Sequence, residues 1–170
     1  MPHPLVDQLR FARRQFGVAL AGTPEADGFR RLGPMNSIGW IVAHLAWQEQ
    51  HYWLTRAQGR TPHIELRHIA PNGGPPTTPP LGQMVALWCD VTQANDPWLD
   101  RLTTSALAAD LDGPGGRRTV ADSIQRVIYH YWFHAGEILA IRQQLGHLRL
   151  PEFVGDIDAR APWRPDSAPD

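Results

Sequence analysis

Two histidines in the last third of the sequence have the spacing of a metal-binding pair. His130 and His134 are four residues apart in the segment YHYWFHAGE. In a helix, this spacing brings the second side chain to within about 40° of the first and one turn along, so both imidazoles can reach one metal ion at about 2.0–2.1 Å. The aromatic residues around the pair indicate a site against the core, where imidazoles need polar partners. Two surface or half-buried histidines without a metal are the alternative interpretation.

The residue after the first histidine of the pair excludes one familiar motif. Zinc proteases of the H-E-x-x-H type need a glutamate there as general base, and this sequence has Tyr131. A third ligand must come from another helix, because a further turn of the same helix projects too far along the axis. His44 is the best candidate, since it lies in the apolar segment SIGWIVAHLAW. The alternative for His44 is a core histidine bonded to a backbone carbonyl.

Three residues near His44 are candidates for the wall of a substrate-binding pocket. Trp40 and Trp47 flank His44 at helical spacing, and His51 lies on the same face two turns further on. Aromatic core packing is the alternative for at least one of the tryptophans. His51 could instead replace a ligand or support one, although polar neighbours such as Glu49 indicate the rim of a site.

Glu137 shares the face of the histidine pair, because it follows His134 by three residues and His130 by seven. Three roles are open for its carboxylate. It could orient an imidazole, act as the catalytic general base for metal-bound water, or form an ion pair with an arginine of the first helix.

Four helical segments must position these residues. Each has apolar residues at spacings of three and four, the pattern of a helix with one buried face, and proline or glycine separates it from the next. The expected helices cover Pro4–Leu20, Asn36–Ala57, the stretch that begins after Pro79-Pro80 and reaches about Leu102, and Thr119–Leu145. Pro97 should kink or restart the third helix, since it removes a backbone donor. Thr119 should cap the fourth, with Asp122 at the capping-box position.

No segment shows sustained alternation of apolar and polar residues, so the sequence predicts an all-α protein with a four-helix bundle. We expect a single domain over residues 1–170, with the bundle at about 4–147 and an irregular tail at 148–170. The tail is too apolar to be free and should pack along the bundle or a partner subunit. Its apolar residues are Leu148, Leu150, Phe153, Val154, Ile157 and Trp163.

The connection between the second and third helices is long and rich in proline. From Gly59 to Pro80 it contains six prolines and three glycines, which excludes a regular helix over its length. A connection of this length is either a lid or binding loop, or a surface crossover that joins two parallel helices.

Composition excludes several classes of function. The net charge of −1 provides no basic face for nucleic acid. All 16 positive side chains are arginine, so catalysis through a lysine Schiff base is excluded. The single cysteine, Cys89, suits a reducing compartment. The N-terminal residues lack the apolar core of a signal peptide, and no apolar run approaches the roughly 20 residues of a membrane span. We expect a soluble, cytoplasmic protein that acts on a small molecule, without nucleic acid or membrane.

Two segments together resemble the DinB-like superfamily, including its YfiT-type members. MNSIGWIVAHLAWQEQHYWL resembles the second helix of that family and HYWFHAGEILAIRQQLGH its last helix, and the likeness covers residues 5 to 150. The resemblance implies an up-up-down-down-like bundle with zinc or nickel bound by one histidine of the second helix and an H-x3-H pair of the last. These positions match His44, His130 and His134. It also implies a possible homodimer and, from characterised relatives, transfer of low-molecular-weight thiols such as mycothiol or bacillithiol.

Three neutral histidines would leave a divalent metal with open positions, as in catalytic sites. Such a metal lowers the pKa of a bound thiol or water. The first hypothesis is a thiol-dependent S-transferase, in which the activated thiolate attacks a small electrophile in detoxification or a stress response. The alternatives are a metal-dependent hydrolase that uses metal-bound water, and a non-catalytic metal- or ligand-binding stress protein.

Overall fold

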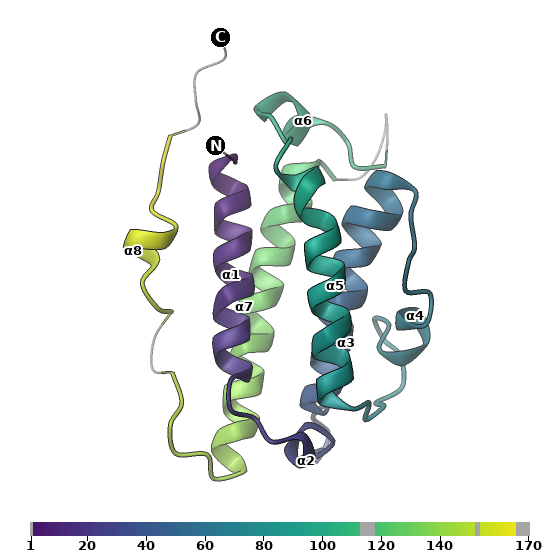
Figure 1. Ribbon diagram of the computed structural model, residues 1–170, viewed down its shortest axis with the longest axis vertical. Coiled ribbons are helices and arrows are strands. Elements are labelled where there is room, and N and C mark those ends of the chain that lie inside the picture. Colours follow the sequence, from purple (N-terminus) through teal and green to yellow (C-terminus); the bar gives the residue numbers. More distant parts are fainter. Residues whose placement is uncertain (1, 113–117, 152–153, 166–170) are drawn as a thin grey trace.

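Four long helices lie side by side in the computed structural model, which describes residues 2–112, 118–151 and 154–165 (Figure 1). They are α1 (Pro4–Leu20), α3 (Ile38–Glu49) continued by the π-helix η1 (Gln50–Arg56), α5 (Leu81–Leu99) and α7 (Val120–Gln144). The connections and the tail contain the short helices α2 (Glu25–Gly28), α4 (Leu66–Ile69), α6 (Thr104–Ala108) and α8 (Ile157–Arg160). The prediction of an all-α four-helix bundle is confirmed.

In chain order the long helices run down, up, up and down in the view of Figure 1. α1 and α7 are parallel neighbours, and Arg142 near the end of α7 donates to the carbonyl of Ala19 near the end of α1 at 2.5 Å. α3 and α5 are also parallel, and Asn95 near the end of α5 donates to Glu49 at the end of α3. The up-up-down-down order implied by the resemblance is therefore wrong.

The lengths of the connections explain the observed order. Residues 21–37, which include α2, reverse the chain at the end of α1, so α3 runs antiparallel to α1. Residues 57–80 are long enough to return along the bundle and start α5 beside the start of α3. There the two elements meet so closely that a Cβ added at Gly39 would lie 2.3 Å from the carbonyl oxygen of Pro79. Only glycine permits this approach.

The predicted helix ends and caps are correct at three places, and of the two alternatives for Pro97 the restart of the helix is wrong. α1 has the expected bounds, and the capping box of α7 is formed, since Thr119 Oγ1 accepts from the Asp122 amide at 3.0 Å and Asp122 Oδ2 accepts from the Thr119 amide at 3.2 Å. α5 starts after Pro80 as expected. It does not restart at Pro97 but continues to Leu99, because the proline lies in the last turn, where one missing backbone bond interrupts little of the helix.

The second long helix changes its hydrogen-bonding pattern after Glu49. Gln50–Arg56 forms a π-helix, in which each backbone bond spans one more residue than in an α-helix. The side chain of Gln50 bonds the backbone of His63 in both directions, with Nε2 donating to the carbonyl at 2.9 Å and Oε1 accepting from the amide at 2.8 Å. The proline-rich segment is thereby tied to η1. π-helical turns frequently occur at functional sites, and the residue pattern did not predict this one.

The segment from Gly59 to Pro80 crosses over on the outer side of α3 and joins two parallel helices (Figure 1). This agrees with the second of the two predictions for it, a surface crossover. It is irregular except for α4. Its backbone carbonyls accept hydrogen bonds from α3, because Trp40 Nε1 donates to Pro75 at 3.2 Å and His44 Nδ1 lies 2.9 Å from the oxygen of Ala70. The crossover is therefore part of the surroundings of His44.

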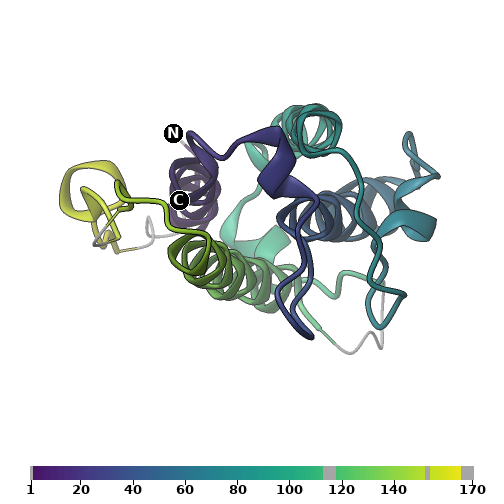
Figure 2. The same cartoon turned by 90° about the horizontal axis from the view of Figure 1, so that it is seen from below.

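The tail lies on the outer side of α1, on the opposite side of the bundle from α4 (Figure 2). Gln8 Nε2 donates to the carbonyl of Ala161 at 2.5 Å, and Ala161 is buried. Packing along the bundle is confirmed, while Leu148 and Trp163 are 95% and 85% exposed in the single chain. Polar contacts tie the tail to α1, from Gln8 to Ala161 and from Arg164 to Asp7. Phe153 lies outside the described residues.

The core lies between the four long helices, and its largest fully buried side chains include Trp53, Tyr131, Phe11 and Phe16. Phe16 contacts Tyr131 edge to face with ring centroids 5.4 Å apart, so α1 and α7 pack through aromatic rings. In the described part of the chain, no helix combines the length and apolar character needed to cross a membrane.

Candidate metal centre

The three predicted histidines come together in the structure. His44 is on α3, and His130 and His134 are on α7. Their ligand nitrogens lie within 4.8 Å of one another, and the Nε2 atoms of His130 and His134 are 2.9 Å apart. Because α3 and α7 are antiparallel, residues near the middle of both helices meet at one point.

Each of the three imidazoles is oriented by an oxygen atom at Nδ1. The contacts are His44 with the Ala70 carbonyl at 2.9 Å, His130 with Gln48 Oε1 at 2.5 Å, and His134 with Glu137 Oε2 at 2.8 Å. A carbonyl or carboxylate oxygen only accepts, so Nδ1 carries a hydrogen in every case, and in the neutral ring Nε2 keeps its lone pair. Oxygen acceptors behind the ring are the usual support of metal-binding histidines.

This arrangement fits a divalent metal. With both Nδ1 atoms protonated, the Nε2 atoms of His130 and His134 face each other at 2.9 Å, which is repulsive unless a proton or a metal ion lies between them. Three neutral nitrogens suit zinc or nickel. For bond lengths of about 2.0–2.1 Å and tetrahedral angles, ligand nitrogens lie about 3.3 Å apart, so the pair needs to open by a few tenths of an ångström.

Burial keeps two of the imidazoles neutral. It lowers the pKa of His44 from 6.5 to about 4. Burial also lowers the pKa of His130 to about 3, with further contributions from the neighbouring charges of His134, His44 and Arg126. A metal binds the neutral form of histidine, so near neutral pH no proton has to leave either ring.

A stack of aromatic rings along α3 and η1 holds His44 in place. The ring of Trp40 stacks on His44 with centroids 4.8 Å apart, Trp47 stacks on the same imidazole at 5.7 Å, and His51 stacks on Trp47 at 5.4 Å. Trp47 and His51 line the adjacent cavity, whereas Trp40 packs behind His44 and is 6% exposed. The predicted pocket wall therefore fits Trp47 and His51, and Trp40 supports the imidazole.

Glu137 lies on the Nδ1 side of His134, away from the nitrogen that faces the other histidines. It is not among the described residues that line the cavity. Among the described residues Glu137 forms no ion pair with an arginine of the first helix, and Arg13 binds Glu49. Of the three roles open for Glu137, this geometry favours the orientation of an imidazole.

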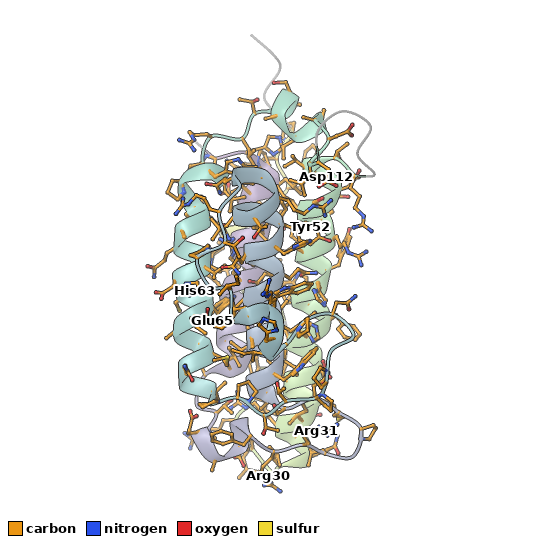
Figure 3. All side chains as sticks on the ribbon, turned by 90° about the vertical axis from the view of Figure 1, so that its right-hand side faces the viewer. Arg30, Arg31, Tyr52, His63, Glu65 and Asp112 are labelled. Atoms are coloured by element: carbon orange, nitrogen blue, oxygen red, sulfur yellow. The ribbon has the colours of Figure 1, made fainter. Side chains whose placement is uncertain are left out.

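A cavity of about 850 Å³ opens beside the histidines between η1 and α7. Its lining includes His44, His130, Asn72 of the crossover, the aromatic residues Trp47, Tyr52, Tyr129 and Phe133, and the charged residues Arg56, Arg118, Asp122 and Arg126. Figure 3 shows Tyr52 between the second long helix and α7. The volume is that of a site for a small organic ligand.

The sequence analysis did not predict Gln48 and Arg126 at this site, although their spacing from the predicted histidines indicated it. Gln48 follows His44 by four residues, and Arg126 precedes His130 by four, so each shares a helix face with a predicted ligand. The carbonyl of Ala70 carried no such signal, because its position depends on the path of the crossover.

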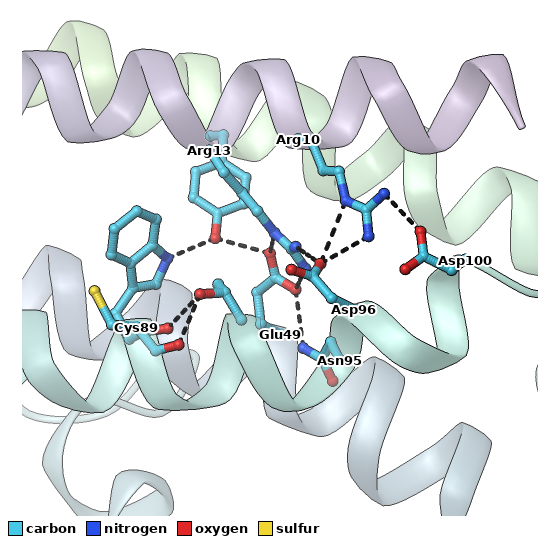
Figure 4. Close-up of polar contacts among 10 residues, drawn as sticks. Arg10, Arg13, Glu49, Cys89, Asn95, Asp96 and Asp100 are labelled. Carbon is cyan, nitrogen blue, oxygen red and sulfur yellow. Dashed lines mark hydrogen bonds and ion pairs between the residues drawn. The ribbon is translucent and has the colours of Figure 1, made fainter. Parts of the chain in front are cut away.

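A buried polar network lies beside the histidines and joins α1, α3, α5 and α7 (Figure 4). Glu49 is fully buried and accepts from Arg13 Nε and Nη2 at 2.7 and 2.6 Å, from the Tyr131 hydroxyl at 2.8 Å and from Asn95 at 3.2 Å. The expected position of Glu49 at a solvated rim is therefore wrong. Burial alone would lower the pKa of Arg13, but the charge and hydrogen bonds of Glu49 outweigh this and raise it.

The network and the metal centre both fix the position of α3 along α7. Glu49 bonds Tyr131, and the residues that precede these two, Gln48 and His130, bond each other. A shift of α3 along α7 would therefore break both contacts together.

A family model described as the DinB superfamily matches residues 8–138. Among curated proteins no relative matches the chain. The matched region contains the three histidines, Gln48 and Glu137.

Proposed function

The chain belongs to the DinB superfamily, and we propose that it is a metal-dependent enzyme that transfers a low-molecular-weight thiol to a small electrophile. The observation that carries the proposal is the convergence of one ligand nitrogen from each of three histidines, two of which, His44 and His130, line a cavity of about 850 Å³. All three Nδ1 atoms are held by oxygen acceptors, so the lone pairs are directed before any metal binds. A structural site would be closed by a fourth protein ligand, whereas three ligands beside a cavity suit catalysis.

A divalent metal bound there would lower the pKa of a thiol. The protein residues supply the rest of the site. Ala70, Gln48 and Glu137 orient the imidazoles, and Trp47 and His51 line the space that a substrate occupies. In the reaction the thiol loses its proton to solvent and its sulfur forms a bond to the electrophilic carbon. The electron pair of the broken bond goes to the departing chloride or, with an epoxide, to the ring oxygen, which stays attached and takes a proton from solvent.

The test is thiol consumption with an alkyl chloride or an epoxide, after the bound metal has been determined by elemental analysis. We expect thiol and electrophile to disappear in equal amounts, and a chelator or His134→Ala to abolish the reaction. His68→Ala is the matched control, because His68 is exposed on α4, and it should retain the rate. Equal rates with and without the chelator would reject the proposal. Hydrolysis of esters or amides without any thiol would instead favour the hydrolase hypothesis.

A further inference from the structure

The cavity beside the histidines has an excess of positive charge. Its lining includes Arg56, Arg118 and Arg126, with Asp122 as the carboxylate among them. Arg56 is neutralised by an ion pair with Asp112. The carboxylate of Asp122 accepts hydrogen bonds in the capping box of α7 and keeps its negative charge. The two remaining guanidinium groups, of Arg118 and Arg126, outnumber this carboxylate, so the lining keeps a net positive charge.

Arg118 and Arg126 have no carboxylate within ion-pair distance in the part of the chain that the structure describes. Arg118 Nη1 lies 3.4 Å from the hydroxyl of Tyr52, a neutral partner. Arg126 precedes His130 by four residues, so its side chain projects from the same face about 6 Å along the helix axis. A cationic group thus lies one helical turn from the metal-facing nitrogens.

Two exposed aromatic rings form a wall of the same cavity. Tyr129 and Phe133 are 69% and 68% exposed and are one helical turn apart on α7. The Phe133 ring also contacts His134 edge to face, with centroids 5.1 Å apart. Large aromatic surface beside unpaired guanidinium groups suits a ligand that has an apolar part and a negative charge.

We propose that the cavity binds an organic anion whose carboxylate or phosphate group is held by Arg126 and Arg118 and whose apolar part lies on Tyr129 and Phe133. Guanidinium groups bind both kinds of anion through paired, charge-assisted hydrogen bonds. In an anion bound in this way, the atoms that are about one helical turn from the charged group lie near the three histidines. The inference rests on the proposed function, since it names the electrophile as an organic anion.

The test is calorimetric titration of benzoate and phenylphosphonate into the full chain, both metal-free and zinc-loaded. Benzamide is the neutral control for the aromatic part. We expect at least one anion to bind metal-free protein about tenfold or more tightly than benzamide, and added salt to weaken the binding. The better of the two anions identifies the charged group as a carboxylate or a phosphate.

The decisive variant is Arg126→Gln, which should weaken anion binding about tenfold or more. Its matched control is Arg30→Gln, because Arg30 is exposed at the opposite end of the bundle from Tyr52 (Figure 3). The control should bind as the native chain does, and both variants should keep the native helical circular-dichroism signal. Equal binding of the anions and benzamide, or unchanged binding in Arg126→Gln, would overturn the inference. Binding only to zinc-loaded protein, unaffected by Arg126→Gln, would assign the anion to the metal and also overturn it.

The two proposals fail separately. The titration of metal-free protein requires neither a thiol nor turnover. Anion binding without thiol consumption would reject the proposed function alone, and thiol consumption without anion binding would reject this inference alone.

Discussion

Replacing Glu49 by alanine removes the acceptor of the buried network and leaves the guanidinium of Arg13 inside the bundle. Removing one partner of a buried ion pair costs about 3–5 kcal/mol of unfolding free energy. Arg13 keeps a second partner, because Nη1 donates to Asp96 at 3.0 Å, which favours the lower end of this range. The hydroxyl of Tyr131 and the amide of Asn95 lose an acceptor as well, at about 1–3 kcal/mol for a buried group left unsatisfied. These two effects oppose each other, so the expected loss of unfolding free energy stays at about 3–5 kcal/mol.

The assay is thermal and urea unfolding of Glu49→Ala beside the native chain. For a chain of this size, 1 kcal/mol corresponds to about 2–4 °C, so the midpoint should fall by about 6–20 °C. Asp100→Ala is the control, because it removes an ion pair with Arg10 in which the aspartate side chain is 51% exposed. An exposed pair contributes up to about 1 kcal/mol, so the control should lose less than about 4 °C.

Equal losses in Glu49→Ala and Asp100→Ala would refute the reasoning. A double variant, Arg13→Met with Glu49→Leu, provides a second check. It leaves no charged group buried in the network, and apolar replacement of a buried pair is often close to neutral. The double variant should therefore be more stable than Glu49→Ala. A larger loss in the double variant would show that the cost comes from packing rather than from the unpaired charge.

The remaining predictions concern the histidines. His44→Ala, His130→Ala and His134→Ala should each lose the stoichiometric zinc or nickel measured by elemental analysis after dialysis, and a full equivalent in all three would contradict the site. Gln48→Ala should retain the metal but bind it about 10–100-fold more weakly in competition with a chromophoric chelator, since it removes the oxygen that orients His130. In metal-free protein the pKa values of His44 and His130 are lowered from 6.5 to about 4 and about 3, so the unfolded chain binds more protons below pH 6.5. Stability should be highest above pH 6.5 and fall as the pH drops toward 4 in urea unfolding with a chelator, and a flat profile would contradict the burial of neutral imidazoles.

Local signals in the sequence predicted most of the fold. The bounds of α1, the capping box of α7 and the start of α5 follow from apolar spacing and from single residues such as Thr119 and Pro80. These features depend on interactions within a few residues of the chain. The π-helix could not be predicted in this way, because Gln50 is bonded to His63 across the crossover. The order of helix directions was also wrong, since it depends on how the connections pass over the bundle.

The candidate site also has one part that the local sequence determines and another part that packing between helices decides. The pair His130 and His134 is determined by the sequence alone, because four residues in one helix place both imidazoles on one face whatever surrounds them. The antiparallel packing of α3 on α7 decided that His44 faces this pair. Gln48 and Glu49 hold α3 in position along α7. The oxygen of Ala70 behind His44 was likewise decided by the crossover. Helical periodicity constrains directions within one element, whereas contacts between elements depend on packing that only the folded chain contains.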